Sequence, residues 1–135
     1  MTAAENKKLI TTAFEAWSRG DGRPFFKLLA DDVRWTVIGS TPVSGTYNSK
    51  SDFRLRLKSL SEKFAGELKA VVRDVIADGD KVAVQWDGHA TGKNGAAYDQ
   101  TYCWVMRLRD GLVCECIAYL DTEMVNRLFN GGRTQ

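Results

Sequence analysis

The chain has 135 residues, which is enough for one domain with a real hydrophobic core. Hydrophobic residues make up 44% of the chain and charged residues 27%, and this composition excludes a disordered protein. The 19 basic and 17 acidic residues leave a net charge of +2 and form no basic stripe, so we expect no nucleic-acid partner.

Targeting and redox signals point to the cytoplasm. No apolar run approaches the roughly 18 residues that a membrane span needs, so we expect no membrane partner. The polar start, Met1 to Lys8, is not followed by the apolar core of a signal peptide. The cysteines Cys103, Cys114 and Cys116 are odd in number and lack zinc or thioredoxin spacing, which predicts reduced thiols in a cytoplasmic protein.

The first residues predict two helices. Thr2 and Glu5 have the spacing of a capping box, in which each side chain accepts a free backbone N–H of the other. Apolar residues then recur at helical spacing as far as Trp17, and Gly20 and Gly22 end the helix. A short second helix is expected from Pro24 to Ala30.

A strand, a loop and a third helix follow. Val33 to Ile38 is predicted as a strand, and Gly39 to Tyr47 as a loop. Ser49 and Asp52 suggest a second capping box. The helix that begins there carries four apolar residues on one face: Phe53, Leu57, Leu60 and Phe64.

The second half of the chain changes from helical to strand periodicity. Four strands are predicted, over Lys69 to Ala77, Lys81 to Ala90, Ala97 to Arg109 and Leu112 to Leu120. The turns between them are short, so the strands should be antiparallel neighbours. A last helix is expected from Thr122 to Phe129, ended by Gly131 and Gly132. Helices followed by strands predict an α+β fold with the helices on one sheet face, and residues 1–135 as a single domain.

The aromatic residues have two interpretations. The four tryptophans come from four different predicted elements, which can meet only between the sheet and the helices. They form either a bulky core or the wall of a pocket, for which the apolar area and polar tip of tryptophan and tyrosine are suited. The predicted wall residues are Trp17, Trp35, Tyr47, Trp86, Tyr102 and Trp104.

The order of these segments carries a family resemblance. A helix, a Gly-Asp break and a short helix precede ADDVRWTVIG, PVSGTY, another helix and four strands. The closing segment from Arg107 to Thr122, which contains Tyr-Leu-Asp-Thr, is the most specific part. From about Lys7 to Phe129 the chain resembles the SnoaL-like and ketosteroid isomerase-related branch of the NTF2-like superfamily. The resemblance implies a cone in which a curved antiparallel sheet wraps around the N-terminal helices, an internal pocket for a small apolar organic molecule, and a homodimer formed through the sheet.

The resemblance also implies candidate catalytic residues. SnoaL-like cyclases and limonene-epoxide-hydrolase-like enzymes carry an acid or base aspartate near the end of the last strand, where this chain has Asp121. Tyr119 lies two residues earlier on the same strand face and could donate a hydrogen bond. Asp121 precedes the last helix, so a helix N-cap is the alternative interpretation.

His89, the single histidine, is a further candidate proton carrier. It shares a strand face with Gln85 and Asp87, opposite Trp86, and would point outward if the apolar face lines the interior. The cyclase histidine aligns one residue later, at Ala90, and one residue reverses the face.

The chain differs from the related enzymes at three site positions, and these differences narrow the range of reactions that it could catalyse. Thr36 occupies the position of the ketosteroid isomerase base, Trp104 lies near the position of its oxyanion-hole aspartate, and Ala118 replaces the glutamate of the related group. These changes argue against steroid isomerisation. No phosphate loop, serine elbow or metal-ligand set is present, so no cofactor or metal is predicted.

Two function classes remain open. One is a cofactor-independent isomerase, cyclase or hydrolase that uses acid–base chemistry. The other is a non-catalytic ligand-binding or interaction module of the same fold. A homodimer is also predicted from the later strands, which carry apolar residues on both faces, as Val105 does between Trp104 and Met106.

Overall fold

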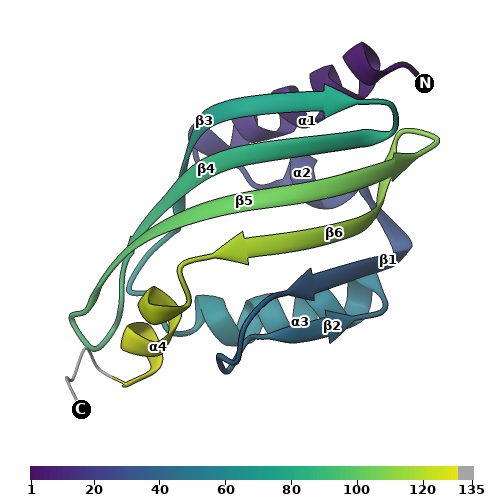
Figure 1. Cartoon of the computed structure of the whole chain (residues 1–135). Coiled ribbons are helices and arrows are strands. Elements are labelled where there is room, and N and C mark those ends of the chain that lie inside the picture. The colour runs from purple at the N-terminus through teal and green to yellow at the C-terminus, as the bar shows by residue number, and fades with distance from the viewer. Residues whose placement is uncertain (131–135) are drawn as a thin grey trace.

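The computed structural model describes residues 1–130, which form helices packed on one curved, six-stranded sheet (Figure 1). The elements follow one another along the chain as α1 (Ala3–Ser18), α2 (Arg23–Lys27), β1 (Leu29–Val37), β2 (Gly45–Tyr47), α3 (Lys50–Ser61), β3 (Lys69–Asp78), β4 (Lys81–Thr91), β5 (Ala97–Arg109), β6 (Leu112–Leu120) and α4 (Thr122–Asn130). The α+β class is therefore confirmed. The expected stop at Gly131 and Gly132 lies outside the described residues.

Both predicted capping sites begin helices. In α1 the Thr2 hydroxyl accepts the Glu5 N–H at 3.1 Å, and the Glu5 carboxylate accepts the Thr2 N–H at 2.8 Å. In α3 the Ser49 hydroxyl accepts the Asp52 N–H at 3.0 Å. These bonds satisfy backbone donors that a helix start leaves free.

The strand order in the sheet is β2-β1-β6-β5-β4-β3. Strands β3 to β6 form the predicted antiparallel run, in which each strand pairs with the next. Strand β1 pairs with β6 in parallel, on the side of β6 that β5 does not occupy. Strand β2 pairs antiparallel with the other side of β1 and forms an edge of the sheet. The last strand, β6, therefore lies inside the sheet between β5 and the first strand, β1, and β2 and β3 are the two edges.

Three predicted boundaries were wrong. The second helix ends at Lys27 and not at Ala30, because Leu29 already pairs with Val113 and the Val113 N–H donates to the Leu28 carbonyl at 2.7 Å. The segment expected to be a loop ends in β2. Phe64 lies beyond the end of α3 and forms an isolated bridge with Gly92.

The helices cover the inner, concave face of the sheet (Figure 1). Helix α1 packs against β3 and β4, α3 packs against β1 and β2, and α4 packs against β5. Within residues 1–130, no helix combines the length and the apolarity that crossing a membrane requires. The inner face therefore carries the core and leaves room for a site where α3 crosses the sheet.

Candidate functional site

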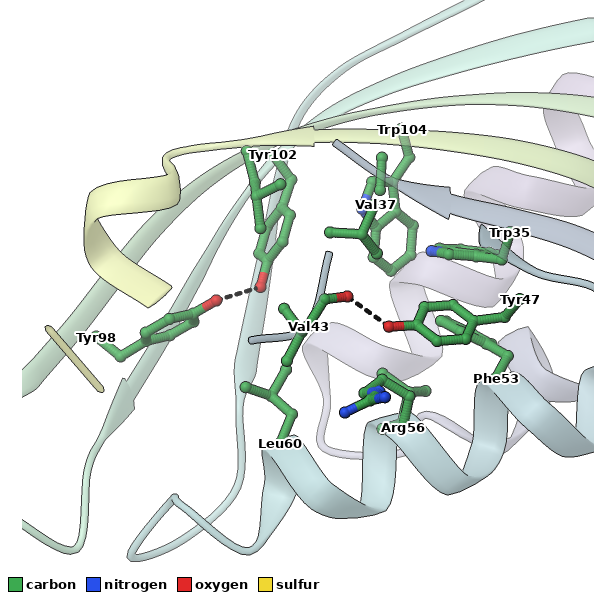
Figure 2. Close-up of a pocket in the computed structure, with 13 residues that line it drawn as sticks. Trp35, Val37, Val43, Tyr47, Phe53, Arg56, Leu60, Tyr98, Tyr102 and Trp104 are labelled. Carbon is green, nitrogen blue, oxygen red and sulfur yellow. Dashed lines mark hydrogen bonds between the residues drawn. The ribbon is translucent and has the colours of Figure 1, made fainter. Parts of the chain in front are cut away.

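A cavity lies between α3, the loop before β2 and the inner face of β1, β5 and β6 (Figure 2). The atom-free space of the cavity, with its open mouth included, is about 470 Å³. The lining side chains are Trp35, Val37, Val43, Tyr47, Phe53, Arg56, Leu57, Leu60, Tyr98, Tyr102, Trp104, Ala118 and Leu120.

Flat aromatic rings form one wall of the cavity. The Trp35 ring on β1 stacks on the Phe53 ring on α3, with centroids 4.2 Å apart and an angle of 21° between the planes. Trp104 meets Trp35 edge to face at 4.8 Å. The buried Trp104 indole N–H has no hydrogen-bond partner among the described residues. This wall is therefore apolar ring surface, with one unused donor buried in it.

Two phenol groups meet at the other side of the cavity (Figure 2). Tyr98 and Tyr102 lie four residues apart on β5 and therefore point to the same face. Their hydroxyl oxygens are 2.8 Å apart. Gln100, between them on that face and only 1% exposed, donates from its amide nitrogen to the Tyr98 oxygen at 3.3 Å.

One phenolic proton of this pair stays free. The Gln100 amide makes the Tyr98 oxygen an acceptor, and the two hydroxyls share one hydrogen bond in either direction. A pair of hydroxyls has two protons, so the second proton remains for another acceptor. Burial raises the pKa of Tyr102 well above its usual value and also raises that of Tyr98. Both phenols therefore stay protonated at neutral pH and act as donors.

Arg56 on α3 is the charged side chain of the lining. Its guanidinium carbon lies 5.6 Å from the centroid of the Tyr47 ring, and one N–H donates weakly to the Pro42 carbonyl at 3.4 Å. The Tyr47 hydroxyl donates to the Val43 carbonyl at 2.6 Å. Arg56 itself is exposed, so it stands where the cavity meets solvent.

The structure brings four of the six predicted wall residues together at the cavity: Trp35, Tyr47, Tyr102 and Trp104. Trp17 and Trp86 are not part of the lining. They pack against each other at 4.9 Å in the adjoining core, where Trp86 also stacks on Tyr102 at 4.1 Å. Their rings support the cavity wall from behind.

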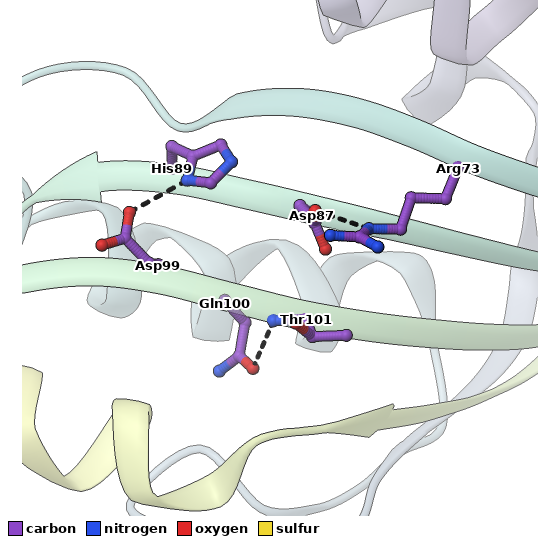
Figure 3. A network of polar contacts seen from close by, with 6 residues as sticks. All are labelled: Arg73, Asp87, His89, Asp99, Gln100 and Thr101. Carbon is purple, nitrogen blue, oxygen red and sulfur yellow. Dashed lines mark hydrogen bonds and ion pairs between the residues drawn. The ribbon is translucent and has the colours of Figure 1, made fainter.

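The three candidate catalytic residues lie away from the cavity. His89 points to the outer sheet face, as its strand alternation predicted, and its Nδ1 lies 2.9 Å from the Asp99 carboxylate (Figure 3). Tyr119 is 45% exposed on the same outer face, because its neighbours Ala118 and Leu120 line the cavity from the inner face. Asp121 is exposed, and its carboxylate accepts the Glu123 N–H at 3.0 Å, which is the geometry of a cap on α4.

Sequence reasoning missed several residues of the site. Tyr98 and Gln100 alternate with Tyr102 and Trp104 along β5, so strand periodicity contained the signal. Arg56 follows Phe53 by three residues and precedes Leu60 by four, which puts all three on one helix face.

The described residues contain no cluster of three or more histidine, cysteine or acidic side chains that could hold a metal ion. The cavity can enclose an apolar body between its rings and aliphatic side chains, with the phenol pair and the Trp104 indole N–H buried in its wall and the positive charge of Arg56 at its mouth.

Comparisons with known proteins agree with this architecture. A family model of the SnoaL-like domain matches residues 10–116. No curated protein matches the chain. An NTF2-like protein from Burkholderia thailandensis E264 has a similar structure, with 20% identity and a TM-score of 0.79, over 96% of this chain and 98% of that one.

Two further solved structures are similar. A protein from Jannaschia sp. CCS1, provisionally named a SnoaL-like polyketide cyclase, is 17% identical with a TM-score of 0.79, over 99% of this chain and 96% of that one. TerC, which was co-crystallised with polyporic acid, is 20% identical with a TM-score of 0.77, over 93% of this chain and 98% of that one. These likenesses show the NTF2-like fold.

Proposed function

The chain belongs to the SnoaL-like family of the NTF2-like superfamily, and from this premise we propose that its cavity binds a small, flat organic molecule that carries an oxygen acceptor. The observation that carries the proposal is the buried Tyr98–Tyr102 hydroxyl pair, which keeps one free proton in a lining that also holds the stacked rings of Trp35 and Phe53. A ketone or other carbonyl would accept that proton, and its apolar body would pack on Trp35 and Trp104.

Binding without chemistry is the activity that this lining supports best. No aspartate, glutamate, histidine, lysine or cysteine is among the lining residues, so no ordinary general base faces the cavity. The two phenols remain protonated and can polarise a carbonyl but cannot remove a proton at neutral pH. The exposed, cap-bonded carboxylate of Asp121 also favours binding over acid–base catalysis.

A second candidate is a cofactor-independent enzyme in which a solvent base at the open mouth accepts the α-proton of a ketone and the free phenolic proton stabilises the enolate that forms. The buried hydroxyl pair supports it, because donors in a water-poor site stabilise developing negative charge on oxygen. Deuterium exchange at the α-carbon of a bound ketone, faster than in buffer alone, would favour this enzyme over a binding protein.

Filling the cavity tests the proposed site. Ala118 is buried in the lining, and Ala118→Leu would add three carbon atoms that project into the cavity. We expect single-ring aromatic ketones and amides to bind the native protein, as seen by saturation-transfer NMR, and to lose at least about tenfold in affinity in this variant. Leu60→Phe at the other side of the cavity should act in the same direction.

The matched control is Ala97→Leu, on the same sheet but exposed and outside the lining. It should bind like the native protein, and melting curves should show that all variants fold. Fragments that bind equally well to Ala118→Leu, Leu60→Phe and the native protein would contradict the cavity as the binding site.

We also propose that the protein forms a homodimer through the outer face of the sheet. Four apolar residues that are partners across neighbouring strands form a stripe over this face: Ile76, Ala83, Val105 and Ile117. The flanking charges are paired within the chain, as in Arg73–Asp87 at 2.7 Å (Figure 3) and Arg107–Glu115 at 3.2 Å. A face with internally paired charges can meet a second copy of itself without like-charge repulsion.

A further inference from the structure

Arg56 gives the cavity a charge of one sign. It is the single charged member of the lining, and no carboxylate lines the cavity to neutralise it. Five other arginines, at positions 23, 73, 107, 109 and 127, lie within 4.0 Å of a carboxylate, whereas Arg56 has no such partner among residues 1–130. Arg56 therefore places a positive charge at the mouth of the cavity.

The donors of Arg56 are largely unused. A guanidinium has five N–H groups, and the one bond that Arg56 makes, to the Pro42 carbonyl, is long at 3.4 Å. The Tyr47 ring beneath the guanidinium holds it beside the cavity through a cation–π contact. The planar fork of N–H groups is thus positioned at the mouth and can bind the two oxygens of a carboxylate.

We propose that the ligand is an aromatic monoanion, with a carboxylate or an equivalent acidic oxygen at Arg56 and an oxygen acceptor at the Tyr98–Tyr102 pair. This inference rests on the proposed binding function and adds the charge and polarity of the ligand. Figure 2 shows Arg56 and the Tyr98–Tyr102 hydroxyls on different sides of a lining that also holds the rings of Trp35, Phe53 and Trp104. A flat ring that carries oxygen groups at opposite ends matches this arrangement.

A pair of nearly identical probes tests the charge. 4-Acetylbenzoate and 4-acetylbenzamide share the ring and the ketone and differ in the carboxylate. We expect the native protein to bind the benzoate at least about tenfold more tightly at low ionic strength, by isothermal titration calorimetry, a factor that corresponds to about 1.4 kcal/mol. Salt at 0.3 M should lower the affinity for the benzoate and leave the affinity for the benzamide unchanged, because ions screen the attraction between the carboxylate and Arg56.

Two variants locate the effect. Arg56→Gln should abolish the preference by weakening the benzoate alone. Arg54→Gln is the matched control, since Arg54 is exposed two residues earlier, contacts the Phe26 ring at 5.7 Å and does not line the cavity. It should keep the preference, and both variants should melt like the native protein because both side chains are exposed.

The outcomes separate this inference from the binding function. Equal affinities of the two probes in the native protein, with binding lost in Ala118→Leu, would overturn the anion preference and leave the cavity as a site. If Arg54→Gln and Arg56→Gln weakened binding of the benzoate equally, the preference would come from the general charge of the surface. This result would also overturn the inference. Absence of binding by both probes would contradict the inference and the proposed function together.

Discussion

At the scale of single residues, Asp121 shows how one side chain can satisfy either of two roles that a sequence suggests. Its carboxylate accepts the Glu123 N–H, while its backbone N–H and carbonyl both bond to Gln100, at 2.7 Å and 2.8 Å. Its backbone N–H, its carbonyl and one carboxylate oxygen are thus occupied by structural hydrogen bonds. This arrangement favours a capping role for Asp121.

Substitution of Asp121 separates the two roles. Asparagine also caps helices, so Asp121→Asn should change the free energy of unfolding by less than about 0.5 kcal/mol, whereas Asp121→Ala should lose about 1 kcal/mol. Both variants should bind 4-acetylbenzamide like the native protein. Urea unfolding measures the stability and calorimetry the affinity. If Asp121→Asn kept the fold but lost most of its binding or of a catalysed reaction, Asp121 would have a direct role in function and not only a capping role.

At this scale the predictable features were the local ones. The partners of the Thr2 capping box lie three residues apart, so the sequence alone identifies both. The phenol pair depends on how β5 faces the helices, and the Arg56 contact with Tyr47 depends on where α3 crosses β2. Such contacts join segments whose relative placement no local pattern specifies.

At the scale of elements, the strands of the second half were predicted closely because alternation and short turns report the same boundaries. The observed β5 and β6 have the predicted ends, Ala97–Arg109 and Leu112–Leu120. The parallel pairing of β1 with β6 was not predicted, since these strands are far apart in the sequence. That pairing also explains the early end of α2, because residues expected to be helical join the sheet.

Gln100 connects two elements and provides an element-scale prediction. Its side chain closes two hydrogen bonds with the backbone of Asp121, where β6 ends and α4 begins. Gln100→Leu leaves these backbone groups without partners in a part-buried place, so we expect a loss of about 2–4 kcal/mol in the free energy of unfolding.

The matched control for this prediction is Gln85→Leu, on the exposed outer face of β4, which should change stability by less than about 0.5 kcal/mol in urea unfolding. Equal stabilities of the two variants would show that Gln100 does not hold β5 to the start of α4. The α4 amides should also exchange faster with deuterium in Gln100→Leu, because α4 packs mainly on β5.

At the scale of the whole molecule, the two sheet faces have different roles. The inner face carries the core and the cavity, and the outer face carries the apolar stripe together with exposed Tyr119 and Ile76, which are 45% and 57% exposed. Exposed apolar area of this kind commonly marks a contact surface. The sequence indicated this surface through the alternation around Val105.

The dimer prediction can be tested by placing a charge in the stripe. The 15.1 kDa chain should sediment as a dimer at micromolar concentration, and Ile117→Lys should shift it to the monomer, because a lysine in an apolar contact must be desolvated. Leu55→Lys is the control, since Leu55 is 68% exposed on α3 and outside the stripe. A native protein that sediments as a monomer would exclude this assembly.

The hydroxyl pair of Tyr98 and Tyr102 has a consequence for ligand choice. Reversing the hydrogen bond between the two oxygens moves the free proton from one oxygen to the other, 2.8 Å away, without moving any carbon, nitrogen or oxygen atom. Such hydroxyl rotations occur within nanoseconds and cost little energy. We therefore expect the proposed site to accept positional isomers whose carbonyl groups differ in position by no more than about the 2.8 Å between the two oxygens.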